Sequence, residues 1–172
     1  ALGLIVHSGY SLDLARQWYG SIQEADWAVI PLMRELQSNV DRRKAREAVG
    51  FTDDDFVVCS FGGLGPSKLN HRLLDAWLAS RLSEHNNSYL VFVGENHGDV
   101  YDQALLSRIG NSKASKRIRI TGWVNADTFR QFLAAADVAV QLRTLSRGET
   151  SAAVLDCMNH GLATIVNANG SM

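Results

Sequence analysis

The sequence predicts an α/β domain built on a Rossmann-like parallel sheet with helices on both faces. From about residue 56, short runs rich in β-branched and aromatic residues alternate with longer amphipathic runs. The strand-like runs are apolar almost throughout, as is typical of strands that are covered on both faces. A repeated order of strand, helix and strand implies right-handed crossovers, which make neighbouring strands parallel.

The expected elements follow one another from residue 56 to residue 166. Apolar runs predict strands over residues 56–61, 89–93, 117–121, 138–142 and 163–166. Apolar residues at helical spacing predict helices over about 69–82, 100–109, 127–136 and 151–159. We expect Asp127 and Thr128 to cap the third of these helices.

The first 50 residues predict a different arrangement. They suggest a strand, a short helix, an extended run and a second helix over residues 2–6, 12–19, 27–31 and 39–49. Gly50 is expected to end the second helix. That helix carries a basic cluster of Arg42, Arg43, Lys44 and Arg46. Because acidic residues lie beside this cluster, we favour a solvated face over an anion-binding patch.

Composition excludes several classes of protein. The 172 residues are 46% hydrophobic, enough for a core, and 17 basic against 18 acidic side chains exclude a surface that binds nucleic acid or anionic membranes through bulk charge. Cys59 and Cys157 lie far apart in sequence and form no Cys/His metal spacing, which disfavours both a disulfide framework and a structural zinc site and fits the reducing cytoplasm. No apolar run approaches the roughly 20 residues of a transmembrane helix. The first residue is not Met and the last follows a strand-like run, so we expect a fragment or an excised domain.

The loop over residues 62–68 is the first candidate binding segment. In an open parallel sheet, ligands bind at the carboxyl ends of the strands, where this loop lies. Gly62 and Gly63 would let backbone N–H groups approach a ligand, and Lys68 is suited to phosphate oxygens. The alternative is a tight turn with Lys68 in solvent. The spacing matches neither the Walker pattern nor G-x-G-x-x-G, which disfavours ATP hydrolysis and NAD binding.

The loop over residues 143–151 is the most informative segment. It contains two arginines, Gly148, Glu149, Thr150 and Ser151 just before a predicted helix, and Ser151 or Thr150 is a plausible N-cap. Arg147 and a helix amino end together suit a diphosphate. Asp156 follows Glu149 by seven residues, so both carboxylates would share a helix face if Glu149 began the helix. Considered separately, each residue has an alternative explanation without a ligand: Glu149 would interact with the helix dipole, and Asp156 would be a polar side chain that faces solvent.

These residues match a family pattern. Residues 148–166 resemble the carboxy-terminal donor-binding domain of GT-B glycosyltransferases of family 4, also called group 1 glycosyltransferases. In that family a Glu, seven residues and a second Glu precede a helix of small residues, a Gly and an apolar strand. Residues 61–68, 92–95, 120–124 and 136–138 resemble other segments of the family in the same order. Residues 1–35 resemble the end of its amino-terminal domain and the linker, and residues 36–172 resemble the donor domain, truncated at its carboxyl end.

The resemblance implies binding of a UDP- or GDP-linked sugar and transfer of the sugar, with retention, to an acceptor. Lys68 falls at the lysine that grips the donor diphosphate, and Asp156 falls at the second Glu, which contacts the ribose. Trp123 borders the base and is a candidate to stack on it. Glu149 is displaced by one residue from the first Glu, yet a loop shift would bring its carboxylate to the sugar. Gly63 replaces an arginine that binds phosphate, so Arg147 or Arg143 is expected to compensate.

The resemblance also implies the setting of the reaction. We expect a cytoplasmic enzyme of polysaccharide or glycoconjugate biosynthesis, free or peripheral to a membrane in its full-length form. It would need no cofactor and no metal ion, and it would take an acceptor sugar, lipid or glycan through the amino-terminal domain, so this fragment alone would be inactive. Two alternatives stay open, namely a noncatalytic nucleotide-binding module and a nucleotide-sugar epimerase of GT-B architecture.

Overall fold

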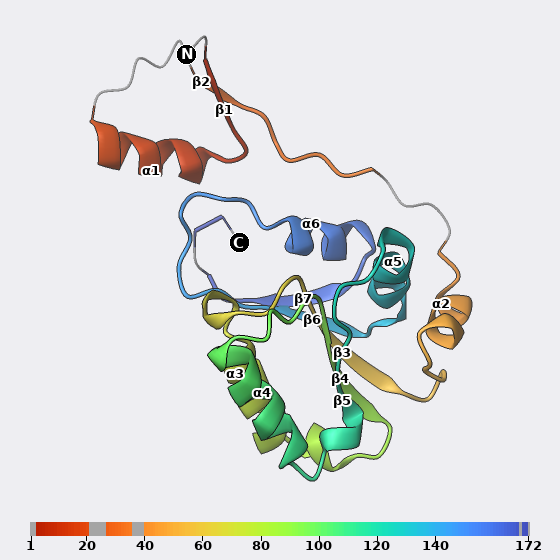
Figure 1. Ribbon diagram of the computed structural model, residues 1–172. Coiled ribbons are helices and arrows are strands. Elements are labelled where there is room, and N and C mark those ends of the chain that lie inside the picture. Colours follow the sequence, from red (N-terminus) through yellow and green to blue (C-terminus); the bar gives the residue numbers. More distant parts are fainter. Residues whose placement is uncertain (1–2, 21–26, 36–39, 169, 172) are drawn as a thin grey trace.

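The centre of the molecule is a parallel sheet. The computed structural model spans residues 1–172 and describes residues 3–20, 27–35, 40–168 and 170–171. Five strands lie in the order β5-β4-β3-β6-β7, with every neighbouring pair parallel (Figure 1). They are β3 (Phe56–Phe61), β4 (Ser88–Val93), β5 (Ile118–Ile120), β6 (Val138–Gln141) and β7 (Ala163–Val166). The predicted α/β fold is confirmed, and β3 and β7 have the predicted bounds.

Helices cover both faces of this sheet, as predicted. Helices α3 (Asn70–Ala79) and α4 (Val100–Gly110) pack on one face, and α5 (Ala126–Ala135) and α6 (Ala152–Asn159) on the other (Figure 1). Alternate residues of β3 divide between the two cores, with Val57 and Cys59 on the α5–α6 side and Val58 on the α3–α4 side. Short 3-10 turns complete the domain as η2 (Pro66–Lys68), η3 (Arg81–Glu84) and η4 (Ser115–Arg117).

In the main domain, one helix end and one helix cap differ from the prediction. The helix expected over residues 69–82 ends at Ala79, because Ser80 is extended and its hydroxyl donates to the Trp77 carbonyl at 2.7 Å. Asp127 and Thr128 do not cap α5. The side-chain oxygen of Asn125 accepts a bond from the Thr128 N–H at 2.9 Å, and Asp127 lies inside the first turn. Asn is among the strongest N-cap residues, so the local chemistry favours the earlier start.

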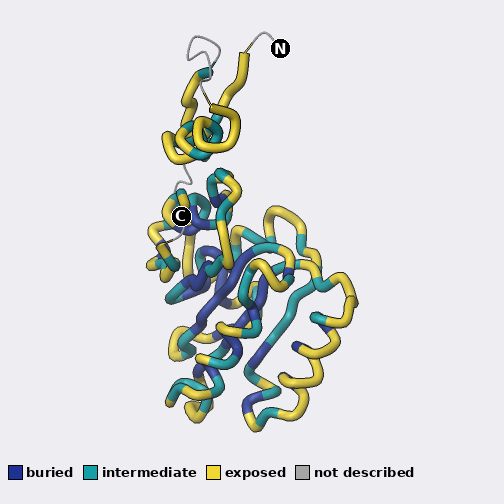
Figure 2. The backbone as a smooth tube through the Cα atoms, turned by 90° about the vertical axis from the view of Figure 1, so that its left-hand side faces the viewer, coloured by how far each residue is buried: buried dark blue, intermediate teal, exposed yellow. Residues whose placement is uncertain are grey.

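The amino-terminal residues form a small unit of their own. Strands β1 (Leu4–Val6) and β2 (Trp27–Val29) are parallel, and α1 (Gly9–Tyr19) connects them. The helix begins before the predicted residue 12 because the Ser8 hydroxyl caps it by accepting from the Ser11 N–H. The predicted strand began at Leu2, which lies outside the described residues. Figure 2 shows that buried backbone is concentrated in the main domain, whereas this unit is largely exposed.

Helix α2 (Arg42–Ala48) corrects one prediction about charge. Arg43 and Lys44 are exposed, as a solvated face requires, but Arg46 is only 2% exposed. Its guanidinium donates to the Asp137 carboxylate at 2.7 Å and to the Ala135 carbonyl at 3.0 Å. Asp137 also accepts from the Val57 N–H at 2.7 Å, so the pair joins α2 to the start of β3. The predicted helix began at residue 39, which lies outside the described residues. Within those residues no helix is both long and apolar enough to cross a membrane.

Replacing Arg46 tests the importance of this buried pair. Arg46→Ala removes the donor to the Ala135 carbonyl and one of the two arginine partners of Asp137, whose carboxylate still pairs with Arg42, and we expect a loss of about 1–3 kcal/mol in the free energy of unfolding. Urea denaturation followed by circular dichroism measures the change. Arg43→Ala, at an exposed site on the same helix, serves as the control and is expected to stay within about 0.5 kcal/mol of the wild type. Equal effects of the two substitutions would contradict the assigned role.

Candidate functional site

The loops after the strands meet at one edge of the sheet. Because the strands are parallel, their carboxyl ends lie together. The Gly62 N–H donates to the Val93 carbonyl and the Leu64 N–H to the Glu95 carbonyl, both at 2.9 Å. A Cβ on Gly94 would lie 2.1 Å from the Gly62 carbonyl oxygen, so only glycine fits there. The loops after β3 and β4 are therefore packed directly against each other.

The glycine loop itself offers few free N–H groups. Those of Gly62 and Leu64 are engaged as described, and the Gly65 N–H donates to the Asn70 side chain at 3.0 Å. Gly62 has φ +105°, and a Cβ on Gly63 would lie 3.6 Å from a ring nitrogen of His97. After η2 the backbone passes through Leu69 at φ +53°, a left-handed conformation that is unusual for a bulky side chain. Such backbone strain is typical of functional sites.

Lys68 lies within this edge and is partly buried. Burial lowers the pKa of its ammonium, the charge of Arg143 lowers it further, and the carboxylate of Glu149 acts in the opposite direction. The loop after β6 is also bonded to the loop after β3, because the Thr144 N–H donates to the Ser67 carbonyl at 3.0 Å. Lys68 is therefore held among the charges of the loop after β6, rather than isolated in solvent.

Glu149 and Arg143 form the centre of that loop. The carboxylate pairs with the Arg143 guanidinium through Oε1, and Oε2 accepts from the Arg147 N–H at 2.7 Å. Burial acts to raise the pKa of Glu149, but the N–H groups of Glu149 and Arg147 and the charges of Arg143 and Lys68 together lower it. Asn167, beyond β7, holds the Arg143 backbone through bonds of 2.8 and 2.7 Å. Sequence reasoning gave Asn167 no role.

A cavity of about 270 Å³ opens beside these charges. Its lining includes Ser67, Arg143, Arg147 and Glu149, so the two candidate loops contribute to one space. Gly148 lies behind it at φ +97° and is approached by helix α1, whose Ser11 hydroxyl donates to the Gly148 carbonyl. The cavity thus has cationic walls and a single carboxylate.

The amino end of helix α6 follows directly. Ser151 is buried and caps the helix by accepting from the Val154 N–H at 3.4 Å, as predicted. The hydroxyl oxygen of Thr150 is buried and has no hydrogen-bond partner among the described residues. A buried polar atom without a partner is uncommon, so this hydroxyl is available for a further hydrogen bond.

Asp156 does not share a helix face with Glu149. Helix α6 begins at Ala152, so Glu149 lies in the loop, and the predicted alignment of the two carboxylates is wrong. Instead Asp156 Oδ1 accepts from Arg34 Nε at 2.5 Å. Trp123 follows β5 at the same sheet edge, and its side chain is exposed. The structure therefore brings Lys68, Arg147 and Glu149 into one region. Asp156 lies on the following helix, where it pairs with Arg34, a partner that the sequence pattern did not indicate.

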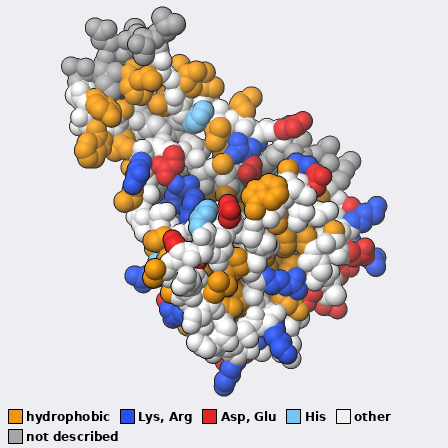
Figure 3. All heavy atoms as spheres, in the orientation of Figure 1, with side chains coloured by type: hydrophobic (Ala, Val, Ile, Leu, Met, Phe, Trp, Pro, Cys, Tyr) orange, Lys and Arg blue, Asp and Glu red, His pale blue; other side chains and the backbone are white. Residues whose placement is uncertain are grey.

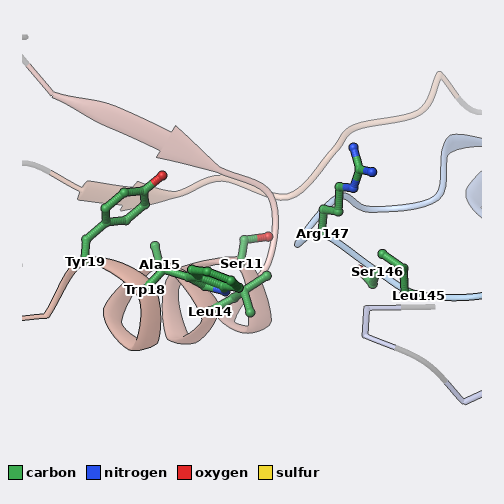
Figure 4. Close-up of a pocket in the computed structure, with 8 residues that line it drawn as sticks. All are labelled: Ser11, Leu14, Ala15, Trp18, Tyr19, Leu145, Ser146 and Arg147. Carbon is green, nitrogen blue, oxygen red and sulfur yellow. The ribbon is translucent and has the colours of Figure 1, made fainter.

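A larger cavity of about 540 Å³ lies between α1 and the same loop (Figure 4). Trp18, Tyr19 and Leu14 line it from the helix, and Leu145 and Arg147 line it from the loop. The last two residues also border the smaller cavity, so the two spaces adjoin. Figure 3 shows acidic and basic side chains gathered beneath the apolar amino-terminal unit. A cationic crevice therefore borders an aromatic one.

Comparison with known proteins assigns the family. The family model of "Glycosyl transferases group 1" matches residues 41–172. The chain belongs to the group 1 glycosyltransferases. This assignment confirms the predicted resemblance to the group 1 glycosyltransferases. Membership of family 4 and the identification of the chain as the donor domain stay predictions. A search of curated proteins finds no match.

Solved structures confirm the GT-B type of fold for this group 1 glycosyltransferase chain. Anabaena Alr3699/HepE in complex with UDP superposes with a TM-score of 0.81 at 24% identity over 99% of this chain. WaaG, a glycosyltransferase of lipopolysaccharide biosynthesis, gives 0.79 at 17% identity over 98% of this chain. The chain spans 46% of the HepE chain and 45% of the WaaG chain. The carboxy-terminal domain of LpcC from Francisella tularensis gives 0.66 at 16% identity, covering 79% of this chain and 68% of that one.

The lowered pKa of Glu149 predicts a pH-dependent contribution to stability. A carboxyl whose pKa is lower in the folded state stabilises the fold above its ordinary pKa, here 4.5, and loses this effect as the pH falls through the folded value. We therefore expect Glu149→Gln to lower the free energy of unfolding at pH 7. The difference from wild type should shrink as the pH falls below about 4.5, as followed by urea denaturation at several pH values.

The partner of Glu149 provides the control. In an Arg143→Met background the same substitution should have a smaller effect at pH 7, because the two side chains act as a pair. A Glu149→Gln effect that is independent of pH and of Arg143 would contradict the assigned interaction.

Proposed function

We propose that this chain is the nucleotide-sugar-binding half of a retaining GT-B glycosyltransferase. The observation that carries the proposal is a small cavity at the carboxyl edge of a parallel sheet that Arg143 and Arg147 line, with Lys68 close enough to interact with the charges of Arg143 and Glu149. The function of that edge in open α/β sheets is ligand binding. Membership of the group 1 glycosyltransferases and the UDP and UDP-glucose complexes of HepE support a UDP- or GDP-linked sugar as the ligand.

A diphosphate fits the chemistry of the cavity. Two guanidinium groups and an ammonium supply the opposite charge, and the amino end of α6 adds a favourable dipole. The Thr150 hydroxyl beside that helix end has no partner within the described part of the chain and can donate to a phosphate oxygen. We therefore propose that these groups, without a metal ion, stabilise the nucleoside diphosphate that leaves when the sugar is transferred.

The remaining candidate residues take roles around this centre. Glu149 is the proposed catalytic residue, since its carboxylate lies beside the cations and would face the donor sugar. Asp156 would accept hydroxyl groups of the ribose, and the exposed Trp123 would stack on the base. Gly62, Gly63, Gly148 and Ser151 shape the backbone around the donor. The packed glycine loop supports a role for Gly62 and Gly63 in conformation more than in direct N–H contacts.

Transfer itself would need the acceptor half of the enzyme. The chain spans less than half of HepE, and its amino-terminal unit lies against the loop that carries Glu149. We propose that an acceptor sugar, lipid or glycan enters from that side in a cytoplasmic enzyme of polysaccharide or glycoconjugate biosynthesis. The chain alone would bind the donor and transfer nothing.

Nucleotide binding tests the proposal directly. UDP, GDP and ADP are added in turn, and the one that binds is expected to stabilise the chain by about 2.7 kcal/mol at 100 times its Kd. Lys68→Ala should weaken that binding about tenfold or more, because a charged hydrogen bond is lost. Thermal unfolding and isothermal titration calorimetry measure the two effects.

Lys44→Ala is the matched control, since Lys44 is exposed on α2. Equal affinities of the two lysine variants, or no stabilisation by any of the three nucleotides, would refute the proposed site.

A further inference from the structure

The ion pair of Arg34 and Asp156 joins two segments that lie 122 residues apart in sequence. Arg34 belongs to the connection between β2 and α2, and Asp156 lies on the second turn of α6. Arg34 Nε donates to Asp156 Oδ1 at 2.5 Å, and the two side chains are only 25% and 28% exposed. The pair therefore lies largely out of solvent.

The connection that carries Arg34 is fixed at several points. At its start, the Ile30 N–H donates to the Val6 carbonyl at 2.8 Å. Directly after Arg34, the Glu35 carbonyl accepts at 2.7 Å from the side-chain amide of Asn159, which lies three residues after Asp156 on α6. The guanidinium is itself oriented, because Arg34 Nη1 donates to the Met33 carbonyl at 3.0 Å. Backbone and side-chain bonds together direct Arg34 at the carboxylate.

This arrangement occupies one carboxylate oxygen only. Among the described residues, Asp156 Oδ2 accepts no hydrogen bond. A partly buried ion pair adds little net stability, because desolvation offsets the attraction between the charges. Its clear effect is on orientation. The guanidinium selects one rotamer of the Asp156 side chain and leaves Oδ2 available as an acceptor.

We propose that Arg34 is a positioning residue for nucleoside recognition. It holds the Asp156 carboxylate so that Oδ2 accepts a hydroxyl group of the donor ribose. This inference rests on the proposed function, which gives Asp156 the ribose contact. It adds that the connection between the two units sets the affinity for the nucleoside part of the donor, while the diphosphate is bound independently by the loop residues.

The test compares three probes on the chain and its variants. The probes are the nucleoside diphosphate that binds best among UDP, GDP and ADP, its 2′-deoxy analogue, and inorganic pyrophosphate, each measured by isothermal titration calorimetry. A site that hydrogen-bonds a hydroxyl rejects the analogue that lacks it, so the wild type should prefer the ribonucleotide. In Arg34→Gln we expect the ribonucleotide to bind about tenfold more weakly and the preference over the deoxy analogue to shrink.

Two comparisons separate positioning from a general structural role. Pyrophosphate should bind Arg34→Gln within about twofold of the wild type, because its contacts do not include Asp156. Arg34→Lys should recover part of the ribonucleotide affinity, since it restores the charge but not the planar donor geometry. Arg43→Gln, an exposed arginine of α2, is the control and should match the wild type for all three probes.

Each other outcome has a distinct meaning. If the wild type binds no nucleoside diphosphate, the proposed function fails. If the wild type binds and discriminates but Arg34→Gln behaves identically, only the role of Arg34 is refuted. Equal weakening for pyrophosphate and ribonucleotide would show a merely structural residue. Tighter ribonucleotide binding by Arg34→Gln would show that Arg34 competes with the ribose, which also overturns the inference.

Discussion

The direction of the five central strands is the constraint on which the rest of the structure depends. Since every neighbouring pair is parallel, each connection must cross a face of the sheet, and each strand delivers its following loop to the same edge. The glycine loop, the loop that contains Glu149 and the segment with Trp123 lie along the same edge of the sheet for that reason. Gly94 then allows the first two strand ends to pack at backbone contact, which no residue with a Cβ would permit.

Charge balance at this edge of the sheet reduces the electrostatic repulsion between its cationic side chains. Partial burial lowers the pKa of the Lys68 ammonium, and the charge of Arg143 lowers it further. The Glu149 carboxylate offsets both, and backbone N–H groups hold it in place. The cluster is therefore preorganised before any ligand arrives. A diphosphate would bring more negative charge to donors that are already oriented, which lowers the reorganisation needed on binding.

The sequence predicted those features that depend on local patterns. The apolar runs located β3 and β7 to the residue. The hydroxyls before the last helix predicted Ser151 or Thr150 as its cap, and Ser151 is the cap. Pairs between distant segments could not be predicted in this way. Arg46 was assigned to solvent because its neighbours in sequence are charged, whereas its partner Asp137 lies 91 residues away. Arg34 gave no signal at all, since nothing near it in sequence identifies Asp156 as its partner.

Two contacts between segments far apart in the sequence lie on one continuous segment of the chain, residues 148–156. The Ser11 hydroxyl of α1 donates to the Gly148 carbonyl in the loop after β6. Arg34 forms an ion pair with Asp156 on α6, the helix that follows this loop. The amino-terminal unit and its connection thus hold both ends of the segment that carries Glu149, Thr150 and Ser151. Both contacts come from the amino-terminal unit and its connection, so the position of these elements is linked to that of the Glu149 carboxylate and the helix end. In a two-domain transferase, such a linkage would couple the acceptor side to the geometry of the donor site.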